Sequence, residues 1–314
     1  MAFLKFNKSE LVNLAYSLKR EIICANKTGA YCNTSIVTCN TRRYHGLLAV
    51  TLDRFGGDRF LLLSSLDESL VVNGKQFNLG IHCYGETYEP RGHKYVVDFD
   101  ADGVPQITYQ VGEIVFRKSL LLSEDRDQLL IKYELLKSPA SAKLLLKPFL
   151  AFRNVHALTR QNAEANVYGS EIQNGMSFRM YANFPDLNIQ VSDSKARFTA
   201  DPSWYNNITY SDERRRGFDC TEDLLVPGTF EMALKPGGSV VVSASITQGR
   251  SPPASSASSP PESRAAVKSP DTATSSAAAQ IRSSPTTTTA RRSMRDIHGS
   301  IPACCARLCS PCPG

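Results

Sequence analysis

The stretch SLVVNGKQFNL, residues 69–79, places two short runs of strand-forming residues on either side of Asn73-Gly74. An Asn-Gly pair favours the tight turn of a β-hairpin, because both central positions of that turn need a positive φ angle. Similar pairs of runs recur along the chain around Gly112-Glu113, Ser138-Pro139 and residues 173–175. Short strands joined by regular turns are typical of an antiparallel β-sandwich.

We therefore predict a mainly β chain that forms a large antiparallel β-sandwich of the supersandwich type. The runs expected to form strands are residues 47–52, 59–63, 69–72, 76–79, 106–111, 114–121, 128–136, 142–150, 167–172, 177–181, 189–191, 195–199, 228–234 and 239–246. Helix-like stretches are short: residues 9–18, with Ser9 as the N-cap, and residues 157–164. There is no alternation of strands with helices, which argues against a parallel nucleotide-binding sheet.

The composition changes abruptly after Gln248. Residues 1–248 hold 28 Lys and Arg against 27 Asp and Glu, whereas residues 249–314 hold eight against three, so most of the net charge of +6 belongs to the last segment. That segment contains no Phe, Tyr or Trp and cannot bury enough apolar surface to offset the cost of ordering. We predict a folded domain over 1–248 and a disordered tail over 249–314, for which a shift of reading frame near Gln248 is one hypothesis.

Net charge, apolar stretches and cysteine spacing indicate which partners and which cellular compartment to expect. The folded part is nearly neutral, so we expect no nucleic-acid partner; binding through the basic tail is the alternative, and it predicts a steep salt dependence. No stretch approaches the roughly 20 apolar residues of a membrane helix, and no signal peptide is visible. Scattered cysteines before residue 248 suit a cytoplasmic protein with reduced thiols. The tail residues Cys304, Cys305, Cys309 and Cys312 lack the paired spacing of a zinc site, and we expect no metal or other cofactor.

The run NTRRYHGLL, residues 40–48, gathers Arg42, Arg43, Tyr44 and His45 directly before an apolar stretch. Two interpretations stay open. If the run is a strand, successive side chains face opposite sides, and an arginine simply pairs with an internal carboxylate. Alternatively, the cluster is a surface that grips a ligand or a neighbouring domain, because the guanidinium fork suits oriented contacts.

Two later segments add candidate binding residues. Arg153 and His156 end the strand-like run that begins at residue 142, although a lone histidine is more often structural. Trp204 and Tyr205 lie beside two asparagines and outside any apolar strand, and Asp223 follows downstream. Aromatic faces stack on sugar rings while Asn and Asp bond the hydroxyl groups; the alternative for Trp204 is packing beneath a long loop. The arginines at 214–216 are typical of a solvated or ion-paired surface.

These segments resemble, in the same order over residues 10–246, the N-terminal domain of the bacterial and archaeal glycogen debranching enzymes, the amylo-α-1,6-glucosidase family. Ile22 and Ala30 depart from the family pattern, where a Trp and a second Gly are common. The resemblance implies a β-sandwich that precedes a helical (α/α) barrel carrying the glucosidase carboxylates, and we expect the chain to end before that barrel. It also implies a role in hydrolysis of α-1,6 branch points, with a suggested 4-α-glucanotransferase step in the N-terminal domain.

The acidic residues support this limit on the chemistry. Glycoside hydrolysis needs two carboxyl groups about 5–5.5 or 6.5–9.5 Å apart, and the adjacent pairs Asp67-Glu68, Asp212-Glu213 and Glu222-Asp223 do not fit that arrangement. We therefore assign no catalytic residue, and whether this chain is itself an enzyme stays open. The predicted role is binding of an α-glucan, glycogen or maltodextrin, or support of the barrel domain; the alternative is a structural interdomain module without glycan affinity. The candidates for either contact are Arg42, Arg43, Tyr44, His45, Arg153, His156, Trp204, Tyr205 and Asp223.

Overall fold

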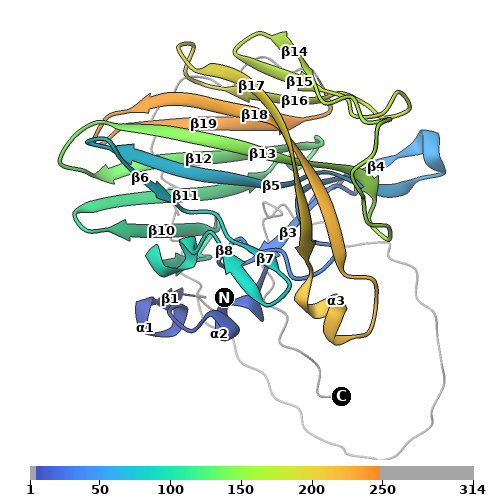
Figure 1. The fold of residues 1–314 in the computed structure, drawn as a ribbon. Coiled ribbons are helices and arrows are strands. Elements are labelled where there is room, and N and C mark those ends of the chain that lie inside the picture. The colour runs from blue at the N-terminus through green and yellow to red at the C-terminus, as the bar shows by residue number, and fades with distance from the viewer. Residues whose placement is uncertain (1–4, 248–314) are drawn as a thin grey trace, which may run out of the picture. The chain divides into compact units, whose positions relative to one another are not determined.

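The computed structural model describes residues 5–247, which fold into two antiparallel sheets that pack as a sandwich (Figure 1). This arrangement confirms the predicted mainly β fold class. The predicted disordered tail over 249–314, with its four cysteines and the reading-frame hypothesis, lies outside the described residues, so the boundary at residue 248 stays a prediction.

One sheet of the described chain contains nine strands. In spatial order they are β1 (Lys5–Asn7), β9 (Val96–Asp100), β10 (Gln106–Val111), β11 (Ile114–Leu122), β12 (Gln128–Lys137), β19 (Ser239–Ser245), β16 (Leu187–Val191), β15 (Gly175–Phe178) and β14 (Gly169–Ile172). The last strand in the sequence, β19, therefore lies inside this sheet, between β12 and β16.

The second sheet contains ten strands among the described residues. In spatial order they are β2 (Glu21–Ala25), β3 (Tyr31–Ser35), β4 (Gly46–Leu52), β5 (Asp58–Val72), β13 (Ala142–Asn154), β18 (Thr221–Leu234), β17 (Arg197–Thr209), β7 (His82–Tyr84) and β8 (Thr87–Glu89), with β6 (Lys75–Asn78) paired to β5. The neighbouring strands β5, β13, β18 and β17 are 13–15 residues long and form the centre of the sheet.

The predicted hairpins are confirmed where turn chemistry is strongest. Asn73 and Gly74 adopt φ angles of 49° and 74° and join β5 to β6, with Val72 opposite Lys75. Gly112, with a φ angle of 59°, helps to join β10 to β11. The strands β14 and β15 form a third hairpin.

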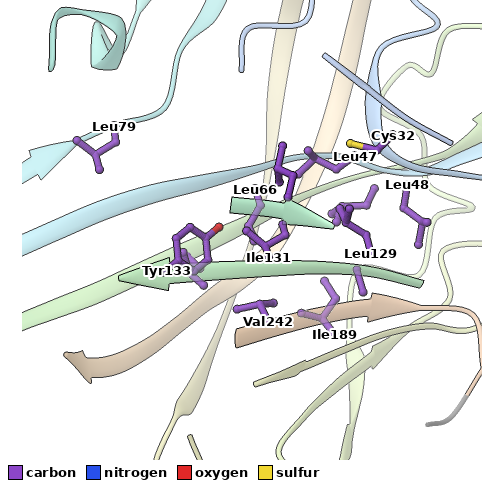
Figure 2. Close-up of a cluster of buried hydrophobic side chains, with 14 of the residues drawn as sticks. Cys32, Leu47, Leu48, Leu66, Leu79, Leu129, Ile131, Tyr133, Ile189 and Val242 are labelled. Carbon is purple, nitrogen blue, oxygen red and sulfur yellow. The ribbon is translucent and has the colours of Figure 1, made fainter. Parts of the chain in front are cut away.

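The main hydrophobic core fills the space between the two sheets. Figure 2 shows Leu66 of β5 near Leu129 and Ile131 of β12, with Ile189 and Val242 from neighbouring strands of the nine-stranded sheet. These side chains are 0–3 % exposed. Alternate positions of β12 are buried, which is the two-residue period expected of a strand with one face in a core.

A second apolar cluster lies on the other face of the ten-stranded sheet. Leu150 and Phe152 of β13 belong to the main core, whereas Phe149 and Ala151 belong to the second cluster, because side chains alternate between the faces of a strand. We call this second group the outer cluster. Its buried members are Ala49, Leu61, Phe149, Ala151, Val155, Ile208, Tyr210, Leu224 and Val226, and the partly buried side chains packed against it are Tyr31, Tyr44, Tyr84, Leu158 and Tyr205.

Two of the departures from the sequence-based expectation concern how the predicted strands are joined. The runs at 59–63 and 69–72 are parts of the single strand β5, because the polar residues between them are accommodated: Ser64 and Glu68 are buried and hydrogen-bonded to other parts of the chain. The turns at 192–194 and 235–238 carry the chain from one sheet to the other, since β16 and β19 belong to the nine-stranded sheet and β17 and β18 to the ten-stranded one.

The helices also differ from the prediction. In place of one helix capped by Ser9 there are two short ones, α1 (Lys8–Leu11) and α2 (Leu14–Leu18), whose N-caps are Asn7 and Asn13. Residues 157–164 form no helix, and α3 (Ser211–Arg215) was not predicted. Two 3₁₀ turns, η1 (Asp53–Phe55) and η2 (Gly92–Tyr95), complete the helical elements of the described chain. None of the helices in residues 5–247 is long and apolar enough to cross a membrane.

Candidate functional site

The run of residues 40–45 forms a turn between β3 and β4, so the strand alternation considered for Arg42 to His45 is wrong. The backbone N–H of His45 donates to the carbonyl of Arg42 at 3.0 Å and closes the turn. Arg153 on β13 donates from Nη2 to the carbonyl of Arg43 at 2.8 Å. The polar side chains of the run reach two places: Arg42 and His45 contact Glu21, and Tyr44 contacts His156.

Arg42 and His45 converge on the buried carboxylate of Glu21 on β2. Arg42 Nε donates to Glu21 Oε1 at 2.8 Å, and His45 Nε2 lies 3.2 Å from the same oxygen. Burial raises the pKa of Glu21, but hydrogen bonds and charges from His45 and Arg42 outweigh burial and hold that pKa below its ordinary value. Arg42 therefore pairs with an internal carboxylate, as the first interpretation of this run predicted.

His45 is completely buried within this turn. Its Nδ1 accepts a hydrogen bond from the backbone N–H of Thr41 at 3.1 Å, so the neutral ring carries its proton on Nε2, which faces Glu21. Thr41 also binds Asp212 of α3 through its carbonyl and its hydroxyl, at 2.9 and 3.3 Å. His45 thus fastens the turn, and no ligand reaches it in this conformation.

Arg153 forms a buried two-pronged ion pair with Glu222 of β18. Arg153 Nη2 lies 3.0 Å from Glu222 Oε2, and Arg153 Nε contacts Oε1. The same carboxylate accepts from the Tyr210 hydroxyl and, at 3.0 Å, from the Thr159 N–H. Burial lowers the pKa of Arg153, but the charges and hydrogen bonds of Glu222 and Tyr210 together outweigh burial and raise that pKa above its ordinary value. Arg153 therefore links β13 to β18 through Glu222 and to the turn through the carbonyl of Arg43.

Asp223 is likewise committed to the backbone. Its two carboxylate oxygens accept from the Gln161 N–H at 3.0 Å and the Asn207 N–H at 2.8 Å. Asn207 has a φ angle of 62°, and the bond from Asp223 supports this irregular position in β17. Asp223 therefore holds the loop after β13 against β17.

Tyr44 and His156 instead line a cavity of about 650 Å³. The Tyr44 hydroxyl lies 3.1 Å from Nδ1 of His156, and the two rings meet edge to face at 5.4 Å. Arg43 donates from Nη1 to the His156 carbonyl at 3.1 Å. Tyr31 of β3 donates to the Tyr44 carbonyl at 3.0 Å, and burial raises the pKa of Tyr31 to about 12. Of the predicted residues, Tyr44 and His156 therefore line the cavity, and Arg43 binds the backbone of His156.

The remaining walls come from residues that the sequence alone did not single out. Tyr31 and Asn33 lie two positions apart on β3 and both face the cavity, while Asp58 and Arg59 begin β5. The sequence does show polar side chains at alternate positions of β3: Tyr31, Asn33 and Ser35. This pattern indicates a cavity wall only once the turn at residue 44 is known to lie beside the strand. The position of Arg59 beside Tyr31 is a long-range feature that spacing does not reveal.

Trp204 and Tyr205 lie within β17, a strand whose residues are mostly exposed or half-buried. Trp204 packs against the main core between the sheets, which agrees with the packing alternative. Tyr205 faces the opposite side, where it packs against the outer cluster and meets Phe149 edge to face at 4.8 Å. Neither residue lines the cavity of Tyr44 and His156.

The adjacent acidic pairs make contacts within the chain, and the cavity holds a single carboxylate. Asp58 is the one carboxylate among the residues that line the cavity. Asp212 and Glu213 are buried in α3 and paired with Arg215 and Arg216, at 3.0 and 3.7 Å. The arginine run itself is ion-paired, as predicted.

No group of three or more His, Cys, Asp or Glu side chains in residues 5–247 is placed to hold a metal ion.

The cavity offers phenol, imidazole, amide and guanidinium groups beside apolar side chains such as Val155. Cavities of about 300–1,000 Å³ with a few polar groups are typical of small-molecule sites. The arrangement therefore suits binding of a small polar ligand.

The fold and the site together define the class of protein. It is a large antiparallel β-sandwich with a cavity lined by aromatic and polar side chains. The family model described as glycogen debranching enzyme N terminal matches residues 20–241. The chain belongs to this family. No curated protein sequence matches the chain.

Several solved structures are similar to part of the chain. A heparan sulfate lyase, HepC from Pedobacter heparinus, is 12 % identical with a TM-score of 0.37, over 71 % of this chain and 34 % of the lyase. A bacterial glucoamylase complexed with acarbose is 8 % identical with a TM-score of 0.35, over 67 % of this chain and 32 % of the glucoamylase. The chain spans about a third of the length of these proteins.

Proposed function

We propose that this chain binds α-glucan in the cavity of Tyr31, Tyr44 and His156, as the N-terminal module of an enzyme that debranches glycogen. The observation that carries the proposal is the cavity itself, in which two phenol rings stand beside imidazole, amide and guanidinium groups. Membership of the glycogen debranching enzyme N-terminal family supports glucan as the ligand.

The chemistry of the cavity suits a neutral polyhydroxy compound. Tyrosine rings offer an apolar face to a sugar ring and a hydroxyl that both donates and accepts hydrogen bonds. Asn33 and His156 add further hydrogen-bonding groups at the cavity wall. Asp58 and Arg59 supply one charge of each sign, so the cavity has no strong preference for an ion.

The proposed role is binding without turnover. A glycosidase site needs two carboxyl groups flanking the bond, and the cavity is lined by one. In the proposed whole enzyme, hydrolysis of α-1,6 branch points belongs to another domain, while this module holds the glucan in the cytoplasm where glycogen is degraded. The 4-α-glucanotransferase step suggested for such domains lacks an assigned residue here.

Affinity electrophoresis of the purified chain in gels with and without glycogen tests the proposal. We expect retardation by glycogen that His156→Ala weakens, because His156 is exposed and its ring bonds to Tyr44. Tyr168→Ala is the matched control, since Tyr168 is 64 % exposed and does not line the cavity. Unchanged mobility of the folded wild-type chain would contradict glucan binding, and release of glucose from a branched limit dextrin would contradict the absence of turnover.

A structural interdomain module is the second candidate, and one observation favours it. Four of the predicted binding residues make hydrogen bonds within the chain: Arg42, His45, Arg153 and Asp223. Such residues stabilise a surface without touching a ligand. A folded chain that shows no affinity for glycogen would support this candidate, with the barrel domain of the family as the proposed partner.

A further inference from the structure

A second group of aromatic and polar side chains lies on the outer face of the ten-stranded sheet, away from the cavity. Its centre is Phe149, whose ring is 4.6 Å from that of His82 and 4.8 Å from that of Tyr205. His82 in turn meets the ring of Tyr84 at 6.4 Å. These rings come from β7, β13 and β17 and contact one another; Phe149 and His82 are buried, and Tyr84 and Tyr205 are half-buried. We call it the second aromatic group.

Charged side chains border this group. His82 Nε2 lies 2.9 Å from both carboxylate oxygens of Asp67, and Lys147 lies directly opposite Asp67 in the pairing of β5 with β13. Lys147 Nζ donates to the Tyr205 hydroxyl at 3.2 Å and stands 5.8 Å from the centre of its ring. Asp67 keeps 18 % of its side chain exposed, and Lys147 is exposed. A partly exposed carboxylate, an exposed ammonium group and two half-buried phenol rings therefore lie around a buried Phe149.

Packing alone does not require this set of residues. Phe149 and its apolar neighbours are already buried, and aliphatic side chains would cover them at least as well as Tyr84 and Tyr205. Half-buried phenol rings beside Asp and Lys instead offer both an apolar face and hydrogen-bonding groups at one place. This is the same combination that lines the cavity of Tyr31 and Tyr44.

The two places lie on the same side of the same sheet. Tyr31 and Tyr44 from the cavity and Tyr84 and Tyr205 from the second aromatic group all pack against the outer cluster. On β5, Arg59 lies at the cavity and Asp67 lies at the second aromatic group. The two residues are eight positions apart, which corresponds to roughly 27 Å at about 3.4 Å per residue of strand. A single sugar cannot touch both, whereas a linear chain of many linked sugars can.

We propose that the second aromatic group is a further glucan contact and that the ligand of this module is a linear α-glucan segment long enough to reach from the cavity to Tyr205. The inference rests on the proposed function and extends it from a small sugar to a long chain. Two contacts on one chain make the second contact intramolecular, so the affinity rises steeply once the glucan spans the distance.

Calorimetric titration of the full chain with maltotriose and with a long linear maltodextrin tests the inference. We expect the maltodextrin to bind at least about tenfold more tightly per chain, in line with the gain from linking two contacts. Tyr205→Ala and Asp67→Asn should each reduce the maltodextrin affinity toward that of maltotriose and leave the maltotriose affinity unchanged. Tyr168→Ala, at an exposed tyrosine outside both places, should alter neither.

The outcomes separate this inference from the function on which it rests. Absence of binding by both sugars would contradict the proposed function itself. Equal affinity for both sugars in the wild-type chain would leave glucan binding intact and overturn the second contact. If Tyr205→Ala unfolds the chain by circular dichroism, Asp67→Asn decides, and a loss of affinity for both sugars in that variant would also overturn the inference.

Discussion

Glu21 connects the turn before β4 to the start of the ten-stranded sheet. Its carboxylate accepts from Arg42 and lies against the Nε2 of His45, although only 10 % of its side chain is exposed. A buried carboxylate without such partners would favour its neutral form. The lowered pKa of Glu21 therefore reports that the folded chain stabilises the charged form more than water does.

This shift predicts a pH-dependent contribution of Glu21 to stability. Because its folded pKa lies below the ordinary value of 4.5, the contribution is complete at neutral pH and is lost as the pH falls from about 4.5 through the folded pKa. Glu21→Gln lacks the charge at every pH. We expect the variant to be less stable at neutral pH, with a gap in unfolding free energy that narrows below about pH 4.5 when measured by urea denaturation.

The comparison between wild type and Glu21→Gln isolates the role of Glu21, because the rest of the chain is the same in both proteins. A gap that stays constant or widens on acidification would contradict the assigned role of Glu21.

Sequence reasoning at the scale of single residues reached the correct residue types but not their partners. The clustering of Arg42 to His45 indicated an ion pair or a binding surface, and the ion pair is present. Glu21 and Asp212 are far apart in sequence, and only the folded sheet brings both to Arg42. The cavity residues Tyr31 and Arg59 were missed for the same reason, since they become neighbours through the pairing of β3, β4 and β5.

At the scale of elements, a buried ion pair links the two sheets through the main core. Lys118 of β11 and Glu68 of β5 are each 1 % exposed, and Lys118 Nζ lies 2.6 Å from Glu68 Oε1. The Tyr133 hydroxyl of β12 donates to the same oxygen at 2.6 Å. A sandwich core is normally apolar, and burying these groups there carries a cost in desolvation.

Removing one member of this pair should be far more harmful than removing both charges. We expect Lys118→Met to lower the unfolding free energy by about 3–5 kcal/mol, because it leaves the Glu68 carboxylate buried without its cation. The double variant Lys118→Met with Glu68→Gln keeps an acceptor for Tyr133 and should recover most of that loss. Urea denaturation of the three proteins measures both effects, and a double variant less stable than Lys118→Met would contradict the argument.

The Arg153–Glu222 pair makes a second prediction about elements, because it joins β13, β18 and the turn that carries Tyr44. Arg153→Met should cost about 3–5 kcal/mol by leaving Glu222 unpaired in the interior. It should also weaken glycogen retardation, since the carbonyl of Arg43 loses its donor.

The matched control for Arg153 is Arg179→Met. Arg179 also grips a carboxylate with two nitrogens, at 2.9 and 2.7 Å from Asp186, but the pair is exposed. Water already solvates both groups there, so the change in urea midpoint should be small. Equal losses in the two variants would show that burial is not the cause of the difference.

The elements themselves were predictable where local chemistry decides them. Asn73-Gly74 and Gly112 mark hairpins whose turn geometry depends on residues adjacent in sequence. The continuity of β5 was not predictable, because the buried Glu68 looks like a break until Lys118 and Tyr133 are placed beside it. The same holds for residues 157–164, whose polar groups bond to Glu222 and Asp223 of a distant strand instead of forming a helix.

At the scale of the whole molecule, the order of strands in space differs sharply from their order in sequence. The strand β19 is the last described element of the chain, yet it pairs with β12 on one side and β16 on the other. Both halves of the nine-stranded sheet therefore depend on residues 239–245. Val240 and Val242 of β19 are also 3 % and 1 % exposed and contribute to the main core.

This topology predicts that a chain ending at residue 238 does not fold. Without β19, the strands β12 and β16 lose their shared neighbour, and the hydrogen-bonding groups along both edges and the core beside them become exposed. We expect the shortened chain to lack the cooperative thermal transition of the full chain in near-ultraviolet circular dichroism and to aggregate. A cooperative transition retained by the shortened chain would mean that the ten-stranded sheet and its outer cluster fold without the completed sandwich.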